Sequence, residues 1–225
     1  MALIEAREVS KVYEIGARRV AVLDGVSLAV AAGEFLVIAG ASGSGKTTLL
    51  SLLSGLDRPS AGRVLFDGRD ITDLDEDALA PVRTVSLGFV FQNFHLVPSL
   101  SVLENVMFPA ELAGDPAARG KSLALLARVG LEDRAQSFPH QLSGGEKQRT
   151  AICRALVNGP RVVFADEPTG NLDSANGAAV LALLLELRRE RGATLVMVTH
   201  NREMAAEADR VVTLRDGRVV AEARG

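Results

Sequence analysis

Apolar residues form short continuous runs in the first third of the chain and again in its last third. The runs at 20–23, 26–30 and 35–39 are rich in Val, Leu and Ile and are separated by turn residues, so they predict strands. Runs at 161–165 and 194–198 have the same character. Continuous apolar strands that alternate with helical segments indicate a parallel sheet covered on both faces.

Between these runs the apolar positions take a helical spacing. Residues 47–53 predict a helix directly after a glycine- and serine-rich loop, residues 101–159 predict a helical insertion, and residues 175–191 predict one long helix. Near the end of the chain, two short apolar runs flank Asp216-Gly217, which predicts a hairpin with a tight turn.

Composition narrows the class of protein. The chain has 225 residues, of which 48% are hydrophobic and 24% charged, as in ordinary globular domains. The most aliphatic stretch, 177–185, is stopped by Glu186, and the N-terminus lacks the features of a secretory signal, so we expect a cytosolic protein without a membrane span. A net charge of −3 gives no global attraction for nucleic acid, and none is expected as a partner. The single cysteine, Cys153, is expected to pack in the core.

The loop after the third predicted strand reads Gly40-Ala41-Ser42-Gly43-Ser44-Gly45-Lys46-Thr47 and fits the phosphate-loop pattern G-x-x-x-x-G-K-[ST]. Its glycines let backbone N–H groups converge on an anion, the lysine brings a full charge to the outer phosphates, and the threonine offers a hydroxyl to Mg²⁺. Because no N-K-x-D segment is present to read guanine, ATP is the expected nucleotide. The candidate nucleotide-binding residues here are Gly40, Ser42, Gly43, Ser44, Gly45, Lys46, Thr47 and Thr48.

A second acidic motif follows an apolar strand. Residues 162–165 lead directly to Asp166 and Glu167. One carboxylate can hold Mg²⁺ and the next can act on a water molecule.

A third motif, Leu142-Ser143-Gly144-Gly145-Glu146-Lys147-Gln148-Arg149, stands at the head of a predicted helix, 146–157. This segment resembles the signature of the ABC ATPases. The resemblance extends over essentially the whole chain, because six motifs occur in the family's order: Tyr13, the phosphate loop, Gln92, the signature, Asp166-Glu167-Pro168 with Asn171-Leu172-Asp173, and His200.

The resemblance implies a role for each candidate residue. Tyr13 would stack on adenine, as an aromatic ring does in this family, and His200 would reach the γ-phosphate. Glu167 would be the general base. Gln92 would sense the metal and the attacking water, so the catalytic set is Glu167, His200 and Gln92, and the Mg²⁺ set is Thr47, Gln92 and Asp166.

The family's head-to-tail arrangement implies a homodimer that forms on ATP binding, because each chain would hold only half of each site. Ser143 and Gly145 would bind the γ-phosphate held by the opposite subunit. Gly144 and Asp173 are further candidate nucleotide-binding residues. The implied fold is α/β: a phosphate-loop NTPase core, with a mostly parallel sheet and an N-terminal antiparallel β-subdomain, plus a helical subdomain. We expect one ABC ATPase domain over 1–225, with the core at 1–92 and 160–225 and the helical signature subdomain at 93–159.

Within the family, 89–98 and 165–173 look most like the lipoprotein-releasing and macrolide-exporter branch, since Gly170-Asn171 replaces the Ser-Ala more usual in importers. This predicts a subunit at the cytoplasmic face of the inner membrane that powers export or extraction of a lipophilic or peptide-like cargo. Integral-membrane permease subunits would dock near Gln92–Glu104, which is unusually apolar for a connection. An alternative in this branch is a mechanotransmitting ATPase that regulates cell-wall hydrolysis at division without transport. Soluble ABC ATPases of DNA repair or translation, which usually carry a coiled-coil insertion or two cassettes, match less well.

Overall fold

The computed structural model describes residues 2–16 and 18–224, with side chains except those of 202 and 203. It divides into two compact units. The first comprises Met1–Ala80 and Thr194–Gly225, and the second comprises Pro81–Ala193. Helix α2 (Glu76–Ser86) includes the boundary. The predicted grouping into a core and a 93–159 subdomain differs from this division and stays a prediction.

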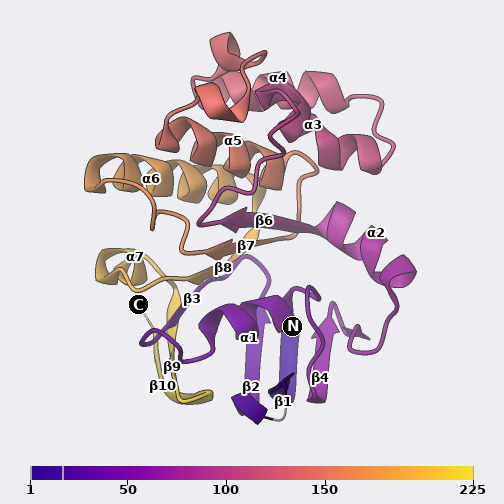
Figure 1. Ribbon diagram of the computed structural model, residues 1–225, viewed down its shortest axis with the longest axis vertical. Coiled ribbons are helices and arrows are strands. Elements are labelled where there is room, and N and C mark those ends of the chain that lie inside the picture. The colour runs from indigo at the N-terminus through magenta and orange to yellow at the C-terminus, as the bar shows by residue number, and fades with distance from the viewer. Residues whose placement is uncertain (1, 17, 225) are drawn as a thin grey trace. The chain divides into compact units, whose positions relative to one another are not determined.

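The first unit contains an antiparallel sheet of order β2-β1-β4-β5, of which Figure 1 labels β2, β1 and β4. Its strands are β1 (Ala2–Ile15), β2 (Arg18–Ala31), β4 (Ala61–Phe66) and β5 (Arg69–Asp70). The runs predicted as two strands at 20–23 and 26–30 are one strand, β2. Asp24 and Gly25 form a bulge opposite Ser10, with Gly25 at φ 60°, so the turn signal marks an irregularity inside the strand.

The same unit contains four strands in the order β10-β9-β3-β8. Strand β3 (Phe35–Ala39) runs parallel to β8 (Thr194–Val198) and to β9 (Arg210–Arg215), and β10 (Arg218–Arg224) returns antiparallel to β9. Every residue of β8 is buried, as its continuous apolar sequence predicts. The predicted hairpin is confirmed, since Asp216 and Gly217 have φ values of 49° and 74°, the conformation that a two-residue hairpin turn requires.

Two helices complete the first unit. Helix α1 (Lys46–Leu53) follows β3 through the phosphate loop and contacts β1, β2 and β8, with Leu49, Leu50, Leu52 and Leu53 buried. The strand, loop and helix predicted from 35–53 are therefore confirmed. Helix α7 (Arg202–Ala206) follows β8.

The second unit joins two parallel strands, β6 (Leu87–Phe91) and β7 (Val162–Asp166), to a group of helices. The helices are α3 (Val102–Leu112), α4 (Ala118–Arg128), two short 3₁₀ turns at Glu132–Arg134 and Pro139–Gln141, α5 (Gly144–Leu156) and α6 (Ser174–Arg191). Helix α5 packs on α3, α4, α6 and β6. It lies so close to β6 that a Cβ on Gly88 would be 2.3 Å from the carbonyl oxygen of Ala155. The predicted helical insertion and the long helix are confirmed.

Helix α5 begins two residues earlier than predicted, at Gly144. Ser143 is its N-cap, and its side chain accepts a hydrogen bond from the backbone N–H of Glu146. Among the described residues, no helix is both long enough and apolar enough to cross a bilayer.

Candidate active site

The phosphate loop in the first unit is shaped by close backbone packing. Gly40 and Gly45 have φ values of 150° and 99°. A Cβ on Gly40 would be 2.2 Å from the carbonyl oxygen of Leu214 in β9, and one on Gly45 would be 2.8 Å from that of Val22 in β2. No side chain fits at either position, so the loop backbone lies directly against two strands.

The polar groups of this loop fit a phosphate anion. Lys46 is only 9% exposed, and its Nζ donates to the carbonyl oxygen of Ala41 at 2.8 Å. The hydroxyl of Ser44 is buried and has no hydrogen-bond partner within the described chain. Helix α1 begins here with no side-chain cap, so its first N–H groups and positive dipole end face the loop. Thr47 is exposed and Thr48 half-buried in the first turn of the helix.

The hairpin turn between β9 and β10 contacts the loop, a support that was not predicted from the sequence. The backbone N–H of Gly217 donates to the carbonyl oxygen of Ser44 at 3.2 Å, and Asp24 donates its N–H to the carbonyl oxygen of Gly217 at 3.0 Å. A Cβ on Gly217 would be 2.5 Å from the carbonyl oxygen of Val22. The Asp-Gly pair indicates a turn, but nothing in the sequence indicates that this turn touches residue 44.

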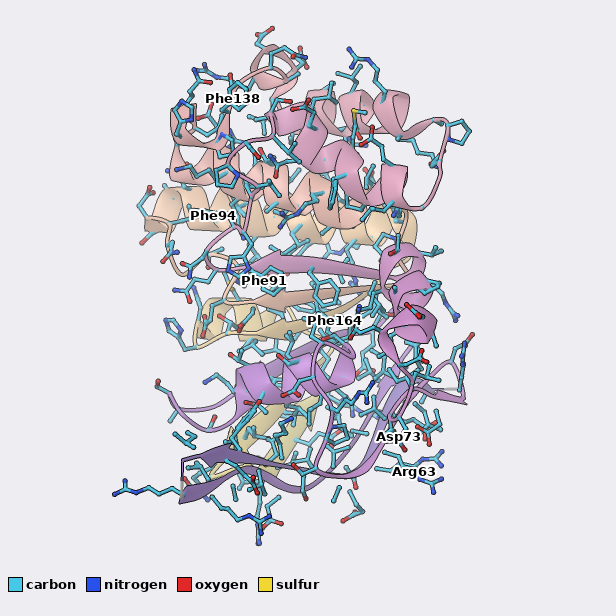
Figure 2. All side chains as sticks on the ribbon, turned by 45° about the vertical axis from the view of Figure 1, so that its right-hand side comes forward. Arg63, Asp73, Phe91, Phe94, Phe138 and Phe164 are labelled. Atoms are coloured by element: carbon cyan, nitrogen blue, oxygen red, sulfur yellow. The ribbon has the colours of Figure 1, made fainter. Side chains whose placement is uncertain are left out.

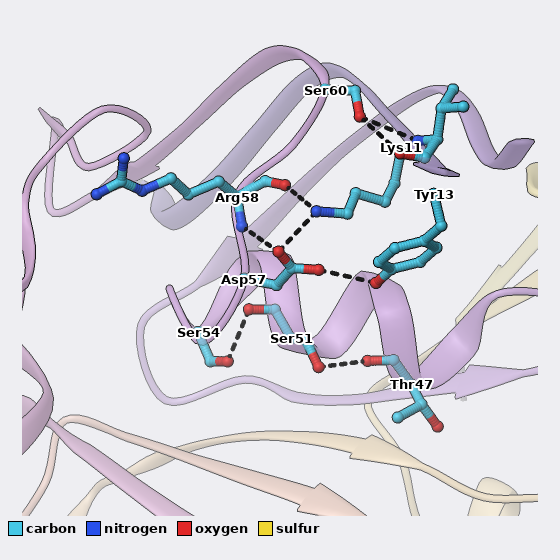
Figure 3. A network of polar contacts seen from close by, with 9 residues as sticks. Lys11, Tyr13, Thr47, Ser51, Ser54, Asp57, Arg58 and Ser60 are labelled. Atoms are coloured by element: carbon cyan, nitrogen blue, oxygen red, sulfur yellow. Dashed lines mark hydrogen bonds and ion pairs between the residues drawn. The ribbon is translucent and has the colours of Figure 1, made fainter. Parts of the chain in front are cut away.

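Tyr13 belongs to a polar network beside α1 (Figure 3). Its hydroxyl donates to Asp57 Oδ2 at 2.8 Å, and Lys11 Nζ lies 4.8 Å from the centre of its ring and 2.6 Å from Asp57 Oδ1. Burial and the Asp57 carboxylate raise the pKa of Tyr13, while Thr48 in the phosphate loop's helix lowers it slightly. The ring is 36% exposed, so it is available to a base, and the predicted stacking on adenine stays a prediction.

His200 lies two residues beyond β8. Because β8 runs parallel to β3 with Val198 opposite Ile38, His200 and Gly40 emerge at the same edge of the sheet. The His200 side chain is exposed. This placement agrees with the predicted approach to a phosphate bound at the loop, and the role of His200 stays a prediction.

The acidic motif of the second unit stands at the end of β7. Asp166 is the last residue of the strand, and Glu167 follows it with a left-handed backbone, φ 46°. This conformation costs a non-glycine residue about 1–2 kcal/mol. The carbonyl oxygen of Glu167 accepts a hydrogen bond from the N–H of Gly170 at 3.0 Å, which closes a turn. Strain of this kind is typical of functional sites.

Three amide side chains, which we call the amide cluster, connect the end of β6 to the segment after β7. They belong to Gln92, Asn93 and Asn171. Asn171 Nδ2 donates to the Gln92 backbone carbonyl and to Asn93 Oδ1, both at 2.9 Å, and Gln92 Nε2 donates to Asn171 Oδ1 at 3.3 Å. Gln92 is a predicted site residue, whereas Asn171 was predicted only as part of a motif.

The chain beyond the amide cluster is held by the helix that carries the signature. Phe94 and His95 both have left-handed backbones, φ 59° and 47°. Arg154 of α5 donates to their carbonyl oxygens at 2.8 and 2.5 Å respectively. The His95 ring lies 4.7 Å from that of Phe91, the last residue of β6. Figure 2 shows Phe91 at the end of β6 and Phe94 on the segment that follows it.

The signature residues form the N-terminus of α5. Ser143 donates its hydroxyl to Glu146 Oε2 at 2.7 Å and its backbone N–H to the same oxygen at 2.8 Å. These two hydrogen bonds, the backbone one above all, lower the pKa of Glu146. Gly144 lies against Leu172, and a Cβ on Gly145 would be 3.4 Å from Asn176 Oδ1. The two glycines therefore let α5 begin close to the segment that leads into α6.

Asp173 is the N-cap of α6. Its carboxylate accepts from the side chain of Asn176 at 2.6 Å and from the backbone N–H of Asn176 at 3.1 Å, and these bonds lower its pKa. Cys153, in contrast, is fully buried, and burial raises the pKa of its thiol to about 12. The predicted packing role of Cys153 is confirmed.

The predicted site residues therefore lie in two groups. The first unit holds Tyr13, the phosphate loop and His200, and the second holds Gln92, the signature, Asp166, Glu167 and Asp173.

Known proteins resemble this chain over most of its length. A family model described as ABC transporter matches residues 23–170. The chain is 52% identical over 223 residues to the pyoverdine export ATP-binding/permease protein PvdT of Pseudomonas putida, covering 98% of this chain and 34% of that protein. It is 49% identical over 221 residues to the macrolide export ATP-binding/permease protein MacB of Syntrophobacter fumaroxidans, covering 96% of this chain and 31% of that protein. It thus spans about a third of the length of these relatives.

A solved structure of the ATP-binding cassette MJ0796, in a dimeric post-hydrolysis state bound to ADP and Pi, superposes with a TM-score of 0.90 at 40% identity, covering 98% of each chain. This likeness confirms the predicted fold. The matches also confirm the predicted class of enzyme, an ABC-type ATP hydrolase. The chain belongs to the ABC transporter family and is one of its ATP-binding cassettes.

Proposed function

We propose that this chain binds Mg²⁺ and ATP, hydrolyses the nucleotide as a homodimer, and drives export through membrane permease subunits at the cytoplasmic face of the inner membrane. The relatives named for pyoverdine export and macrolide export support an exporter. They favour it over the regulation of cell-wall hydrolysis. A lipophilic or peptide-like cargo, by lipoprotein release or macrolide export, is our proposal for what is moved.

The phosphate loop is the observation that carries this proposal. It combines a buried lysine, a buried serine hydroxyl without a protein partner and an uncapped helix N-terminus, in a backbone that leaves no room for side chains at Gly40 and Gly45. A cationic ligand would be repelled by the lysine charge and the helix dipole, and a neutral acceptor would gain hydrogen bonds but no attraction between charges. A triphosphate would satisfy them.

The residues proposed for the metal fit Mg²⁺ in kind, because all of them offer hard oxygen atoms. They are the hydroxyl of Thr47, the side-chain oxygen of Gln92 and the carboxylate of Asp166. When bound, Mg²⁺ would neutralise charge on the phosphoryl group being transferred. Lys46 would bind the outer phosphates, and His200 would contact the γ-phosphate. Glu167 would accept a proton from the attacking water as general base.

The dimer would complete each site. Ser143, Gly144 and Gly145 at the N-terminus of α5, with Asp173, would bind the nucleotide of the partner subunit. The dimeric state of the MJ0796 cassette supports this arrangement. Since the Ser143 hydroxyl has one proton, donating it to a phosphate would require it to leave Glu146 Oε2.

Glu167→Gln tests the shared site. We expect this variant to bind ATP and hydrolyse it very slowly, so that a dimer accumulates in size-exclusion chromatography with ATP. Lys46→Ala added to Glu167→Gln should stay monomeric, because it removes the charge that meets the phosphates. The shared-site proposal fails if Glu167→Gln remains monomeric in saturating ATP.

The segment Gln92–Glu104 is proposed as the permease docking surface. Val97 is 38% exposed and Phe94 and Leu96 are half-buried, whereas Leu103 is buried in the core of the unit. We expect Val97→Asp to lose co-purification with the permease while keeping the ATPase activity of the isolated chain. Val85→Asp is a matched control, since Val85 is 56% exposed on α2 of the same chain. If both variants assemble equally well, docking lies elsewhere.

A further inference from the structure

The side chain of Gln92 has a defined orientation, and Asn171 defines it. A glutamine amide has one donor end and one acceptor end. In this structure the donor end, Nε2, bonds to Asn171 Oδ1. The acceptor end, Oε1, is therefore left for another ligand.

Asn171 is itself fixed by two further hydrogen bonds. Its Nδ2 donates both protons, one to the backbone carbonyl of Gln92 and one to Asn93 Oδ1. With Nδ2 committed in this way, a reversed Asn171 amide would place its oxygen against two acceptors. The orientation of Asn171 therefore follows from its contacts, and the orientation of Gln92 follows from that of Asn171.

Gly170 supplies the space that this arrangement needs. A Cβ at residue 170 would be 2.8 Å from Gln92 Nε2, 3.1 Å from its Cδ and 3.3 Å from its Cγ. The Gln92 side chain thus lies flat on the Gly170 backbone. A side chain at 170 would force either the Gln92 amide or the backbone at 170 to shift, which would disturb the contact with Asn171.

The backbone of the same segment is fixed from the other side. Arg154 bonds to the carbonyl oxygens of Phe94 and His95. The backbone that follows Gln92 is therefore held in place by Arg154, so the contact with Asn171 can determine the orientation of the Gln92 amide.

We propose that Gly170 and Asn171 act as a positioning pair that fixes the Gln92 amide with Nε2 turned to Asn171 and Oε1 presented to Mg²⁺ or the attacking water. The inference rests on the proposed function, in which Gln92 meets the metal. It gives a physical role to the dipeptide Gly170-Asn171. Alanine has no side-chain amide, and serine at 170 would occupy the space of Gln92.

The amide cluster is exposed, so water competes for each of its hydrogen bonds. The contribution of Asn171 is therefore small. Its removal should weaken the effect of Mg²⁺ on the Kd for ATP by roughly threefold to tenfold, the equivalent of about one net hydrogen bond.

The experiment compares the Kd for ATP in Mg²⁺ with the Kd in EDTA, measured by calorimetry on the full chain carrying Glu167→Gln to prevent turnover. Asn171→Ala should raise the Kd in Mg²⁺ by that factor and leave the Kd in EDTA unchanged, so the ratio of the Kd in EDTA to the Kd in Mg²⁺ should fall. Gly170→Ala should shift the ratio in the same direction. The two changes together should have less than the sum of their effects, because both act through Gln92.

The decisive comparison is made in a Gln92→Ala background, where Asn171→Ala should no longer change the ratio. If Asn171→Ala still changes it there by the same factor, the positioning pair is refuted while the role of Gln92 stands. If Gln92→Ala alone leaves the ratio at the parent value, the metal role of Gln92 fails, and the positioning pair fails with it. ATP binding at the phosphate loop is unaffected by either result.

Asn158→Ala is the control for a purely structural loss. Asn158 also donates its Nδ2 to two backbone carbonyls, those of Thr84 and Pro109, in the same unit. It should lower the melting temperature without changing the Kd ratio. An equal change of the ratio in Asn158→Ala and Asn171→Ala would overturn the proposal, as would no change in Asn171→Ala.

Discussion

The phosphate loop and the amide cluster both bear candidate site residues, yet they are built from different parts of the chain. The loop is shaped by backbone atoms pressed against β2 and β9, and its key lysine is buried. The amide cluster is shaped by exposed side chains that bond to one another. A site made of packed backbone tolerates almost no change, whereas one made of exposed amides can be adjusted in small steps. The phosphate loop suits the proposed ligand, a triphosphate. The amide cluster suits the proposed role of Gln92, because small changes can adjust the position of that side chain.

The largest effect is expected where the loop backbone is crowded. Gly40→Ala would place a Cβ against the carbonyl oxygen of Leu214 and should lower the free energy of unfolding by about 2–4 kcal/mol, with loss of ATP binding. Gly43→Ala is the matched control. Its φ is also positive, 78°, but no atom lies within 4 Å of the added Cβ, so it should cost only about 1–2 kcal/mol. Urea denaturation measures both. Equal costs would mean that packing against β9 does not shape the loop.

This difference between the two regions also explains what could be predicted from the sequence. The phosphate loop is a local pattern between a strand and a helix, so its residues and its fold were both predictable. The contact of Gly217 with Ser44 and that of Asn171 with Gln92 join residues far apart in the chain, and no local pattern encodes them. Strand β2 was divided in the prediction because Gly25 is typical of a turn. In the structure Gly25 is part of a bulge in the pairing with β1, and the strand continues through it.

The half-buried side chain of Arg154 anchors the segment that follows the amide cluster. Burial lowers the pKa of Arg154, which is withdrawn from water and bonds to two carbonyl oxygens. Arg154→Met keeps an apolar stem but loses both charge-assisted bonds, so the free energy of unfolding should fall by about 2 kcal/mol. Arg154→Lys can restore one bond and should recover about half of the loss. If lysine is no better than methionine, packing rather than hydrogen bonding holds the Phe94–His95 segment.

The smallest expected effect concerns the hydroxyl of Tyr13, whose task can be separated from that of the ring. Tyr13→Ala should weaken ATP binding by about 1–3 kcal/mol if the ring stacks on the base, and Tyr13→Phe should leave the affinity nearly unchanged. The hydroxyl instead acts on Asp57. Burial raises the pKa of Asp57, but hydrogen bonds from Lys11, Tyr13 and the Arg58 N–H outweigh it, so the net pKa lies below its ordinary value.

A lowered folded-state pKa stabilises the protein above the unfolded-state pKa of the carboxyl, and this stabilisation is lost as the pH falls through the folded-state value. Tyr13→Phe removes one donor and lets the pKa of Asp57 rise, so the variant should be less stable by about 0.5–1 kcal/mol at pH 7. The difference in free energy of unfolding between the variant and the parent should shrink as the solution is acidified, because the Tyr13 hydroxyl favours the ionised form of Asp57 and that form is lost. Urea midpoints at pH 7 and in the acid range measure this. A deficit that stays constant with pH would show that the hydroxyl does not act through the Asp57 carboxylate, and a large loss of ATP affinity in Tyr13→Phe would place the hydroxyl, rather than the ring, against the nucleotide.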